Sequence, residues 1–203
     1  MAKLILVRHG ESLWNAIDLW TGLTDISLSE KGRDEARLAG SSLKDLKIDI
    51  AFTSVLRRAK ETLDEIKKIL NLDSLQVVEN EALNEKNYGV FTGKNKWEVE
   101  KEVGKELFIQ IRRGWNYQIP NGESLKDVYD RVIPYYQKEM LPKLKDGKNV
   151  LVVAHGNSLR ALVKYLENIT DKGVENLEIA TGEIYIYDIG QDGNIISKEK
   201  RLS

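Results

Sequence analysis

The sequence contains only two histidines, His9 and His155, and both stand in the same local setting. Each comes after a run of apolar, mostly branched residues, Leu4–Val7 and Val150–Ala154, and each is followed directly by a glycine. A single histidine is more often a structural residue than a catalytic one. An imidazole can, however, act as a nucleophile or exchange a proton near neutral pH. Because the same setting occurs twice, we interpret the two histidines as parts of one chemical site.

The two apolar runs predict short strands that are buried on both faces of a sheet. In an open sheet of parallel strands, ligands bind in the crevice outside the carboxyl ends of the strands. If the two strands are neighbours, His9 and His155 face one cleft. The glycines that follow, Gly10 and Gly156, let the backbone turn sharply and leave room for a ligand.

Further charged groups are expected near strand ends, and together they suit phosphoryl transfer. Arg8 and Arg58 supply guanidinium groups that match phosphoryl oxygens bidentately, and Glu85 supplies a carboxyl group. The sequence has no cysteine and no Gly-x-x-x-x-Gly-Lys-Ser/Thr loop, which excludes a thiolate nucleophile and a nucleotide-binding P-loop. An imidazole is then the best candidate for a covalent intermediate, and neighbouring arginines should lower its pKa and keep it neutral.

The composition limits the class of protein. A length of 203 residues suits one α/β domain spanning residues 1–203. The 31 basic and 32 acidic residues nearly cancel, so neither nucleic acid nor a membrane is an expected partner. With two histidines and no cysteine, we expect no metal site. The run Leu4–Val7 is too short for a signal-peptide core, so we expect a cytoplasmic protein.

Strand-like and helix-like segments alternate along the chain. The expected strands are residues 4–7, 48–53, 75–79, 150–154 and 183–189, with a short one after the turn at Asp192-Gly193. The expected helices are residues 12–15, 29–46 with Ala36, Leu38, Ala39 and Leu43 facing inward, 55–70, a helical region from 95 to 113, 124–144 with a bend at Pro134, and 158–166. This alternation predicts a three-layer α/β fold: a mostly parallel central sheet, helices on both faces and one antiparallel edge strand.

Several short segments match a known pattern. They are Val7–Ser12, Trp20–Gly22, Thr53–Ala59, Leu83–Glu85 with Tyr88-Gly89, Asn95-Lys96, Arg112–Gly114 and Ala154–Leu162. The first and last resemble the signatures of the histidine phosphatase superfamily. Together with the middle segments, they make the chain similar to the 2,3-bisphosphoglycerate-dependent phosphoglycerate mutases, from about Lys3 to about Ile189.

The resemblance implies a role for each matching position. The implied catalytic residues are His9, Glu85, His155, Arg8 and Arg58. The implied substrate-binding residues are Ser12, Asn15, Thr21, Gly22, Tyr88, Lys96, Arg112, Arg113, Gly156 and Asn157. His9 would become the phosphohistidine, and Glu85 would exchange the proton of the substrate hydroxyl. Arg112 and Arg113, with Tyr88 and Lys96, would grip the far phosphate and carboxylate of phosphoglycerate.

The implied reaction interconverts 3-phosphoglycerate and 2-phosphoglycerate. In this reaction 2,3-bisphosphoglycerate is the cofactor that supplies the priming phosphoryl group, and no metal takes part. The implied partners are small-molecule phosphoglycerates.

Departures from the mutase pattern keep other functions open. The chain between Arg113 and Ser124 is shorter than in the commonest members, and the C-terminal extension of many relatives is nearly absent. Lys86-Asn87 also stands where the mutase branch more often has Arg-His. A less covered phosphohistidine should lose its phosphate to water.

The second candidate function is therefore that of a histidine phosphatase acting on phosphoglycerates or another small phosphoester. A catalytically silent domain that binds phosphorylated ligands is a third possibility. Since the missing insertion removes surface commonly used for subunit contacts, we expect a monomer or a weak homodimer.

Overall fold

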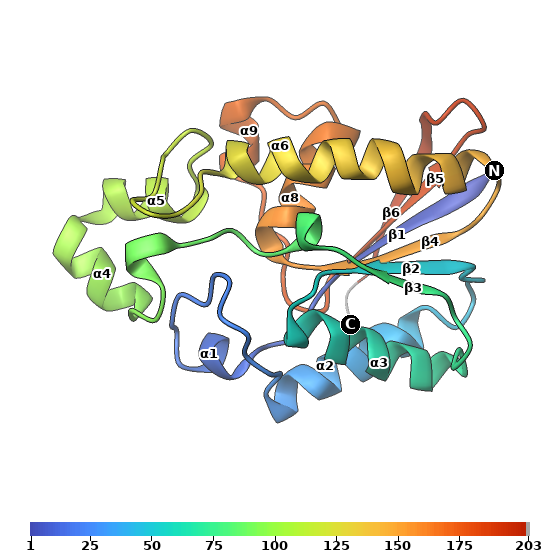
Figure 1. The fold of residues 1–203 in the computed structure, drawn as a ribbon, viewed down its shortest axis with the longest axis horizontal. Coiled ribbons are helices and arrows are strands. Elements are labelled where there is room, and N and C mark those ends of the chain that lie inside the picture. The colour runs from blue at the N-terminus through green and yellow to red at the C-terminus, as the bar shows by residue number, and fades with distance from the viewer. Residues whose placement is uncertain (202–203) are drawn as a thin grey trace.

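In the computed structural model, which describes residues 1–201, a six-stranded sheet lies between two layers of helices (Figure 1). The strands are β1 (Ala2–Arg8), β2 (Ile50–Thr53), β3 (Val77–Glu79), β4 (Val150–Ala154), β5 (Ile184–Ile189) and β6 (Ile195–Arg201). The helices are α1 (Leu13–Ala16), α2 (Glu30–Ser42), α3 (Arg57–Leu70), α4 (Lys96–Val103), α5 (Lys105–Arg113), α6 (Leu125–Tyr135), α7 (Leu141–Lys145), α8 (Gly156–Leu166) and α9 (Asp171–Glu175).

The strand order is β3-β2-β4-β1-β5-β6. The first four strands pair in parallel, whereas β5 is antiparallel to β1 and β6 is antiparallel to β5. The predicted mostly parallel α/β sheet is confirmed. Its antiparallel edge consists of a two-stranded hairpin, since the strand after Asp192-Gly193 pairs back onto β5.

Hydrophobic cores lie on both faces of the sheet. Ile5 and Val7 of β1 pack into the core beneath α2 and α3, and Leu4 and Leu6 pack into the core beneath α6 and α8. Figure 1 shows these two helix layers on opposite sides of the sheet. Burial on both faces explains why the strands read as continuous apolar runs.

A smaller third core lies away from the sheet. It consists of Trp20, Tyr88, Phe91, Val99, Phe108, Ile111 and Ile119. Helices α4 and α5 contribute Val99, Phe108 and Ile111 to it and project from one end of the molecule (Figure 1). This cluster supports α4 and α5 without help from the central sheet.

The predicted helix over residues 29–46 is shorter in the structure, and one of its expected core residues is exposed. Helix α2 ends at Ser42, and Leu38 is 54% exposed, whereas Ala36 and Ala39 are fully buried. Each helical residue advances by about 100°, so Leu38 lies about 200° around the axis from Ala36. It therefore faces solvent.

The long helix predicted over residues 124–144 is divided. Helix α6 contains Pro134 and is followed by a π-helical turn at Tyr136–Met140 and then by α7. Proline has no N–H and cannot donate the i to i−4 hydrogen bond, which favours a break in regular helical bonding near this point.

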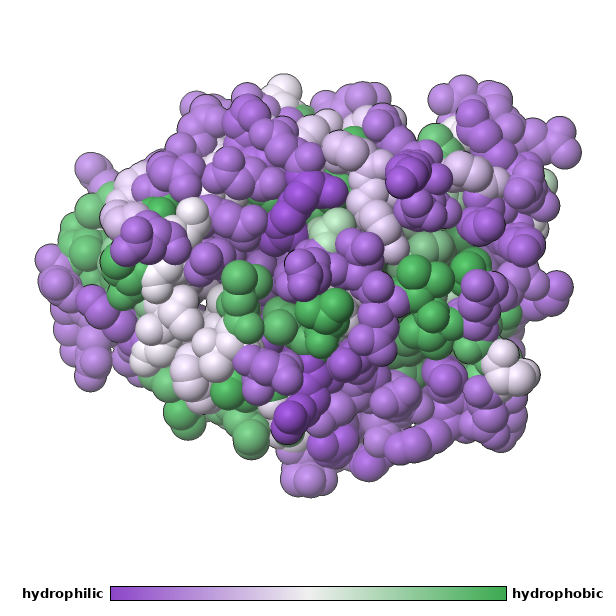
Figure 2. Space-filling model, viewed as in Figure 1, coloured by the Kyte–Doolittle hydropathy of each residue, from purple (hydrophilic) through white to green (hydrophobic). Residues whose placement is uncertain are grey.

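The surface in the view of Figure 2 is mostly hydrophilic and carries several hydrophobic patches, one of them at the end that holds α4 and α5. Trp97, Leu107 and Ile109 on these helices are exposed by 46%, 37% and 40%. None of the helices in residues 1–201 has the length and apolar character needed to cross a membrane.

Candidate active site

The two histidines meet at the carboxyl ends of neighbouring strands. The parallel pairing of β1 and β4 places Arg8 opposite Ala154, and His9 and His155 come next along each chain. Their ring centroids are 4.9 Å apart. The backbone N–H of His9 also donates to the carbonyl of Ala154 at 3.0 Å. Sheet pairing thus brings both imidazoles into one buried place.

A hydrogen bond fixes which nitrogen of His9 can act as a nucleophile. Nδ1 of His9 lies 2.6 Å from the carbonyl oxygen of Gly10. Since a carbonyl oxygen only accepts, the neutral ring carries its hydrogen on Nδ1 and has a free lone pair on Nε2. The N–H of Gly10 donates to Thr62 Oγ1 at 3.1 Å, and that hydroxyl donates to the carbonyl of Arg58 at 2.8 Å. The loop after His9 is therefore tied to α3.

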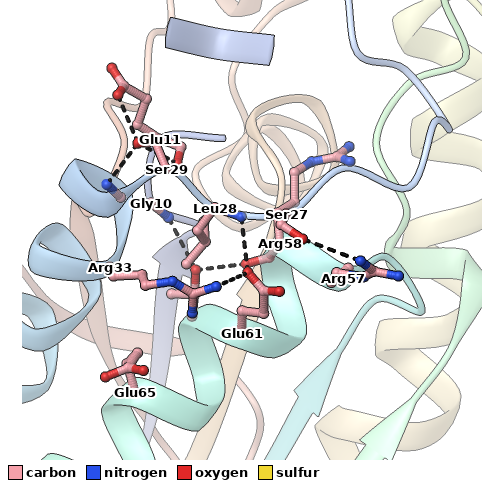
Figure 3. Close-up of polar contacts among 12 residues, drawn as sticks. Gly10, Glu11, Ser27, Leu28, Ser29, Arg33, Arg57, Arg58, Glu61 and Glu65 are labelled. Atoms are coloured by element: carbon pink, nitrogen blue, oxygen red, sulfur yellow. Dashed lines mark hydrogen bonds and ion pairs between the residues drawn. The ribbon is translucent and has the colours of Figure 1, made fainter. Parts of the chain in front are cut away.

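The same loop is pressed against the first turn of α2, as Figure 3 shows. A Cβ on Gly10 would lie only 2.1 Å from the carbonyl oxygen of Gly32, and a Cβ on Gly32 only 2.0 Å from that of Glu11. Both positions therefore require glycine. The N–H of Glu11 donates to Glu35 at 2.8 Å, and its carbonyl accepts from the N–H of Ser29 at 2.9 Å. These contacts hold His9 at a fixed angle.

Burial and nearby arginines keep both imidazoles neutral. Burial lowers the pKa of His9 well below its ordinary value, and Arg58 and Arg8 lower it further against the opposing hydrogen bond to Gly10. Burial is also the main cause that lowers the pKa of His155, followed by Arg58 and His9. The sequence predicts that arginines lower the histidine pKa, but burial lowers it more than the arginines do.

Arg58 is a buried cation held by a loop. Its guanidinium donates to the carbonyls of Gly22 and Thr24, each at 2.9 Å. Burial is the main cause that lowers the pKa of Arg58 to about 10, and at this pKa the guanidinium stays charged at neutral pH. The neighbouring Arg57 instead donates to Ser27, and Figure 3 shows the two guanidinium groups diverging. Only one of this pair of arginines therefore serves the site.

His155 has one free ring nitrogen. Its Nε2 lies 2.7 Å from Ser54 Oγ, and this hydroxyl already accepts from the N–H of Leu56 at 3.2 Å. Within the described residues, Nδ1 of His155 is buried without a hydrogen-bond partner. If Ser54 donates to Nε2, the hydrogen of His155 resides on Nδ1, where it is available to an oxyanion.

Glu85 has one carboxylate oxygen engaged and another facing the site. Its Oε1 accepts from the N–H of Lys86 at 2.7 Å and from the Asn157 side-chain amide at 2.9 Å. A Cβ on Gly156 would lie 3.7 Å from Glu85 Oε2 and 3.5 Å from Cζ of Arg8. A longer side chain at Gly156 would enter the space between these groups. Glu85 is thus oriented at the same strand end as the histidines.

Asn157 connects Glu85 to two further side chains. Its amide nitrogen also donates to the hydroxyl of Tyr88 at 3.0 Å, and its Oδ1 accepts from Arg160 at 2.8 Å. Burial raises the pKa of Tyr88, so its hydroxyl stays protonated. Arg160 donates to the carbonyls of Val174 and Arg113 at 2.7 and 3.2 Å. The network joins α8 to the end of α5.

Lys86 is buried behind this network. Its Nζ donates to the carbonyl of Ile111 at 2.8 Å and lies 4.8 Å from the ring centroid of Tyr88. Burial, followed by the charge of Arg160, lowers its pKa to about 7. Lys86 therefore ties the loop that carries Glu85 to α5.

A second group of cations lies on the helices outside the sheet. Arg112 and Arg113 end α5, and both form ion pairs with Glu178; the Arg112 pair spans 3.3 Å. Lys96 begins α4 and lies 3.9 Å from Asp18. Burial lowers the pKa of Lys96. This group faces the same pocket as His9.

One pocket gathers nearly all the residues that the sequence implicates. The implicated residues that line it are Arg8, His9, Asn15, Thr21, Gly22, Arg58, Glu85, Tyr88, Lys96, Arg112, Arg113, Gly156 and Asn157. Ser12 and His155 are buried behind its wall. Ser12 caps α1, where its hydroxyl accepts from the N–H of Asn15 at 3.2 Å and the Asn15 side chain accepts from its backbone N–H. Its position suits a structural role.

The structure adds pocket residues to which the resemblance assigns no role, although Trp20 and Arg160 lie within matching segments. They are Leu19, Trp20, Arg160, Leu177, Glu178 and Ile179. Arg160 follows Asn157 by three positions on α8, so helical spacing could have placed it on the same face. Glu178 lies in the loop after α9, where no periodic pattern marks it. Within residues 1–201, no group of three or more histidine or acidic side chains is arranged to hold a metal ion.

Comparison with known families assigns the class of protein. Residues 4–200 match the family described as the histidine phosphatase superfamily, branch 1. The chain belongs to this superfamily.

Individual relatives share nearly half of their residues with this chain. The chain is 48% identical to a 2,3-bisphosphoglycerate-dependent phosphoglycerate mutase of Cytophaga hutchinsonii, over 93% of this chain and 88% of the relative. It is also 48% identical to the protein of that name from Chelativorans sp., over 97% of this chain and 96% of the relative. Among solved structures, Bacillus stearothermophilus YhfR is similar with a TM-score of 0.84 at 25% identity, over 96% of this chain and 94% of that one.

Proposed function

We propose that this protein interconverts 3-phosphoglycerate and 2-phosphoglycerate through a phosphohistidine on His9. The observation that supports this most strongly is a pocket with two groups of cations. Arg8 and Arg58 accompany His9, whereas Arg112 and Arg113 lie on α5. A substrate with a phosphate and a carboxylate can engage both groups at once.

Donors that suit an oxyanion lie in the pocket and directly behind its wall. Within the described residues, Nε of Arg8, Oγ1 of Thr21 and Nδ1 of His155 are buried without hydrogen-bond partners. Buried donors without partners are costly unless a ligand satisfies them. These residues fit 2,3-bisphosphoglycerate, which when bound supplies the priming phosphoryl group. No metal is part of the proposal.

The chemical step uses His9 and Glu85. The Nε2 lone pair of His9 forms a bond to phosphorus, and the bond between phosphorus and the departing oxygen breaks. Arg8 and Arg58 stabilise the charge on the phosphoryl oxygens during transfer. Glu85 gives a proton to the departing oxygen. When the substrate hydroxyl takes the phosphoryl group from His9, Glu85 receives the hydroxyl proton, and the proton balance is restored.

The short chain does not argue against a mutase. The match with the mutase of Chelativorans sp. covers 97% of this chain and 96% of that mutase. The two proteins are therefore of nearly equal length. In this role the protein is an isomerase of glycolysis and gluconeogenesis. We propose that it acts in the cytoplasm as a monomer or weak homodimer.

Hydrolysis is the second candidate, because the α5 side of the pocket is open to solvent. The side chains of Arg112 and Glu178 are 37% and 56% exposed. Water that reaches the phosphohistidine would convert the same enzyme into a phosphatase acting on phosphoglycerates or another small phosphoester.

Phosphorus NMR of 3-phosphoglycerate, with and without 2,3-bisphosphoglycerate, separates the two functions. We expect conversion to 2-phosphoglycerate that 2,3-bisphosphoglycerate activates. Release of inorganic phosphate as the main product would instead identify a phosphatase. An unchanged spectrum in both samples would contradict both functions and point to a domain that only binds phosphorylated ligands.

A further inference from the structure

Glu178 places a carboxylate on the arginine pair that the substrate is expected to use. Its two oxygens form ion pairs with Arg112 and Arg113, and all three side chains line the pocket. The arginines hold the pKa of Glu178 below its ordinary value against the opposing effect of burial, so it is ionised at neutral pH. A carboxylate on two guanidinium groups is the contact that the carboxylate of phosphoglycerate would make.

The position of α5 does not depend on this contact. The carbonyl of Ile111 accepts from buried Lys86 at 2.8 Å, and the carbonyl of Arg113 accepts from Arg160 at 3.2 Å. Phe108 and Ile111 also pack into the third core. Glu178 is therefore not required to hold α5 against the rest of the protein.

The ion pairs of Glu178 can open at little cost. Its side chain is 56% exposed, and those of Arg112 and Arg113 are 37% and 25% exposed. Ion pairs this accessible contribute little to stability, because water and salt screen them. A released Glu178 carboxylate can be hydrated by solvent, so a substrate that binds both arginines and the His9 end at once can replace it.

We propose that Glu178 is a resident carboxylate that occupies Arg112 and Arg113 in the free enzyme and is displaced by the acid group of the substrate. This inference rests on the proposed function. Glu178 is then a specificity-determining residue. It weakens the binding of anions that reach only the arginine pair, and it favours ligands that also engage the phosphoryl end.

The charges of the pocket lining support this role. The cationic side chains that line the pocket are Arg8, Arg58, Lys96, Arg112, Arg113 and Arg160, and the acidic ones are Glu85 and Glu178. Neutralising Glu178 removes one of these two carboxylates and leaves Glu85 in place. Affinity for anions should rise as a result.

The test compares Glu178→Gln with Glu139→Gln. Glu139 pairs with Lys138 outside the pocket, so the second substitution changes the net charge equally and serves as a matched control. Binding of 3-phosphoglycerate and of inorganic phosphate is measured by titration calorimetry in a His9→Ala background, where no phosphoryl group is transferred. KM and kcat are measured with His9 intact.

We expect Glu178→Gln to lower the Kd for 3-phosphoglycerate by about three- to fivefold, more at low salt, and Glu139→Gln to leave it unchanged. KM should fall in parallel while kcat stays within about twofold. An unchanged or higher Kd in Glu178→Gln would overturn the inference, since a structural role predicts weaker binding.

The inorganic phosphate titration separates this inference from the proposed function. If 3-phosphoglycerate binds to no variant while Glu178→Gln still tightens phosphate binding, the displacement role stands and the proposed substrate is wrong. If Glu178→Gln tightens neither ligand, the displacement role itself is wrong.

Discussion

The pocket has two ends that are built differently. The phosphoryl end consists of His9, His155 and Arg58, which are at least 98% buried and are set by strand pairing and backbone hydrogen bonds. The other end consists of Arg112 and Arg113, which stand on a helix with its own small core and remain partly exposed. Rigid geometry therefore governs the first end, and charge balance governs the second.

The two ends should therefore contribute to different kinetic constants. Preorganised buried donors act mainly on charge that develops in the transition state, so they affect kcat. Exposed arginines contact a part of the substrate that does not react, so they contribute to ground-state and transition-state binding alike and affect KM.

The largest effect is expected at the buried end, from Arg58→Lys. Lysine keeps the charge but cannot bond to the carbonyls of Gly22 and Thr24 while also presenting a guanidinium fork. We expect kcat to fall by about 10²- to 10³-fold, or about 3 to 4 kcal/mol, with a smaller change in KM. Steady-state kinetics measure both constants.

The adjacent Arg57 provides the matched control for this substitution. It lies in the same helical turn but donates to Ser27 and lies 3.8 Å from Asp25. Arg57→Lys should leave kcat nearly unchanged. Equal losses of kcat in both variants would contradict the assignment of Arg58 to the phosphoryl end.

The next effect concerns pH and stability. The pKa values of His9 and His155 are lowered in the folded chain, so below about pH 6.5 the unfolded chain binds protons that the folded chain does not. The free energy of unfolding should therefore fall as pH decreases, by up to about 1.4 kcal/mol per pH unit for each histidine. Urea unfolding between about pH 6.5 and 5.5 measures this slope.

A His9→Asn variant sharpens the pH test. It removes one of the two buried imidazoles, so the slope in this range should fall to about half. The same slope in the variant and in the unmodified protein would show that the two histidines do not control acid stability.

The smallest effect is expected at the exposed end, from Arg113→Lys. An ammonium group cannot pair bidentately with a carboxylate, so KM for 3-phosphoglycerate should rise by about fivefold while kcat stays nearly constant. Added salt should raise KM in the unmodified protein as well. A loss of kcat as large as that in Arg58→Lys would remove the distinction between the two ends.

The sequence predicts the buried end better than the exposed end. Apolar runs before Arg8-His9 and before His155 predict strands, and strand ends in a parallel sheet meet in space. Arg58 could be predicted in the first turn of α3, because the helical period after Ser54 is clear. Local sequence patterns report such features directly.

The remaining features depend on tertiary contacts that no local pattern records. Glu178 reaches Arg112 across 66 positions in sequence from a loop without periodicity. The dominance of burial in the pKa of His9 likewise requires the complete packing around the ring.

The proposed mechanism requires a phosphoryl group on Nε2 of His9, and a labelling experiment can detect that group. The protein is mixed with 2,3-bisphosphoglycerate that carries labelled phosphate, and acid-labile label on the protein is measured and mapped. We expect label on His9, and neither label nor turnover in His9→Ala. Substantial labelling or mutase activity in His9→Ala would show that His9 does not carry the phosphoryl group.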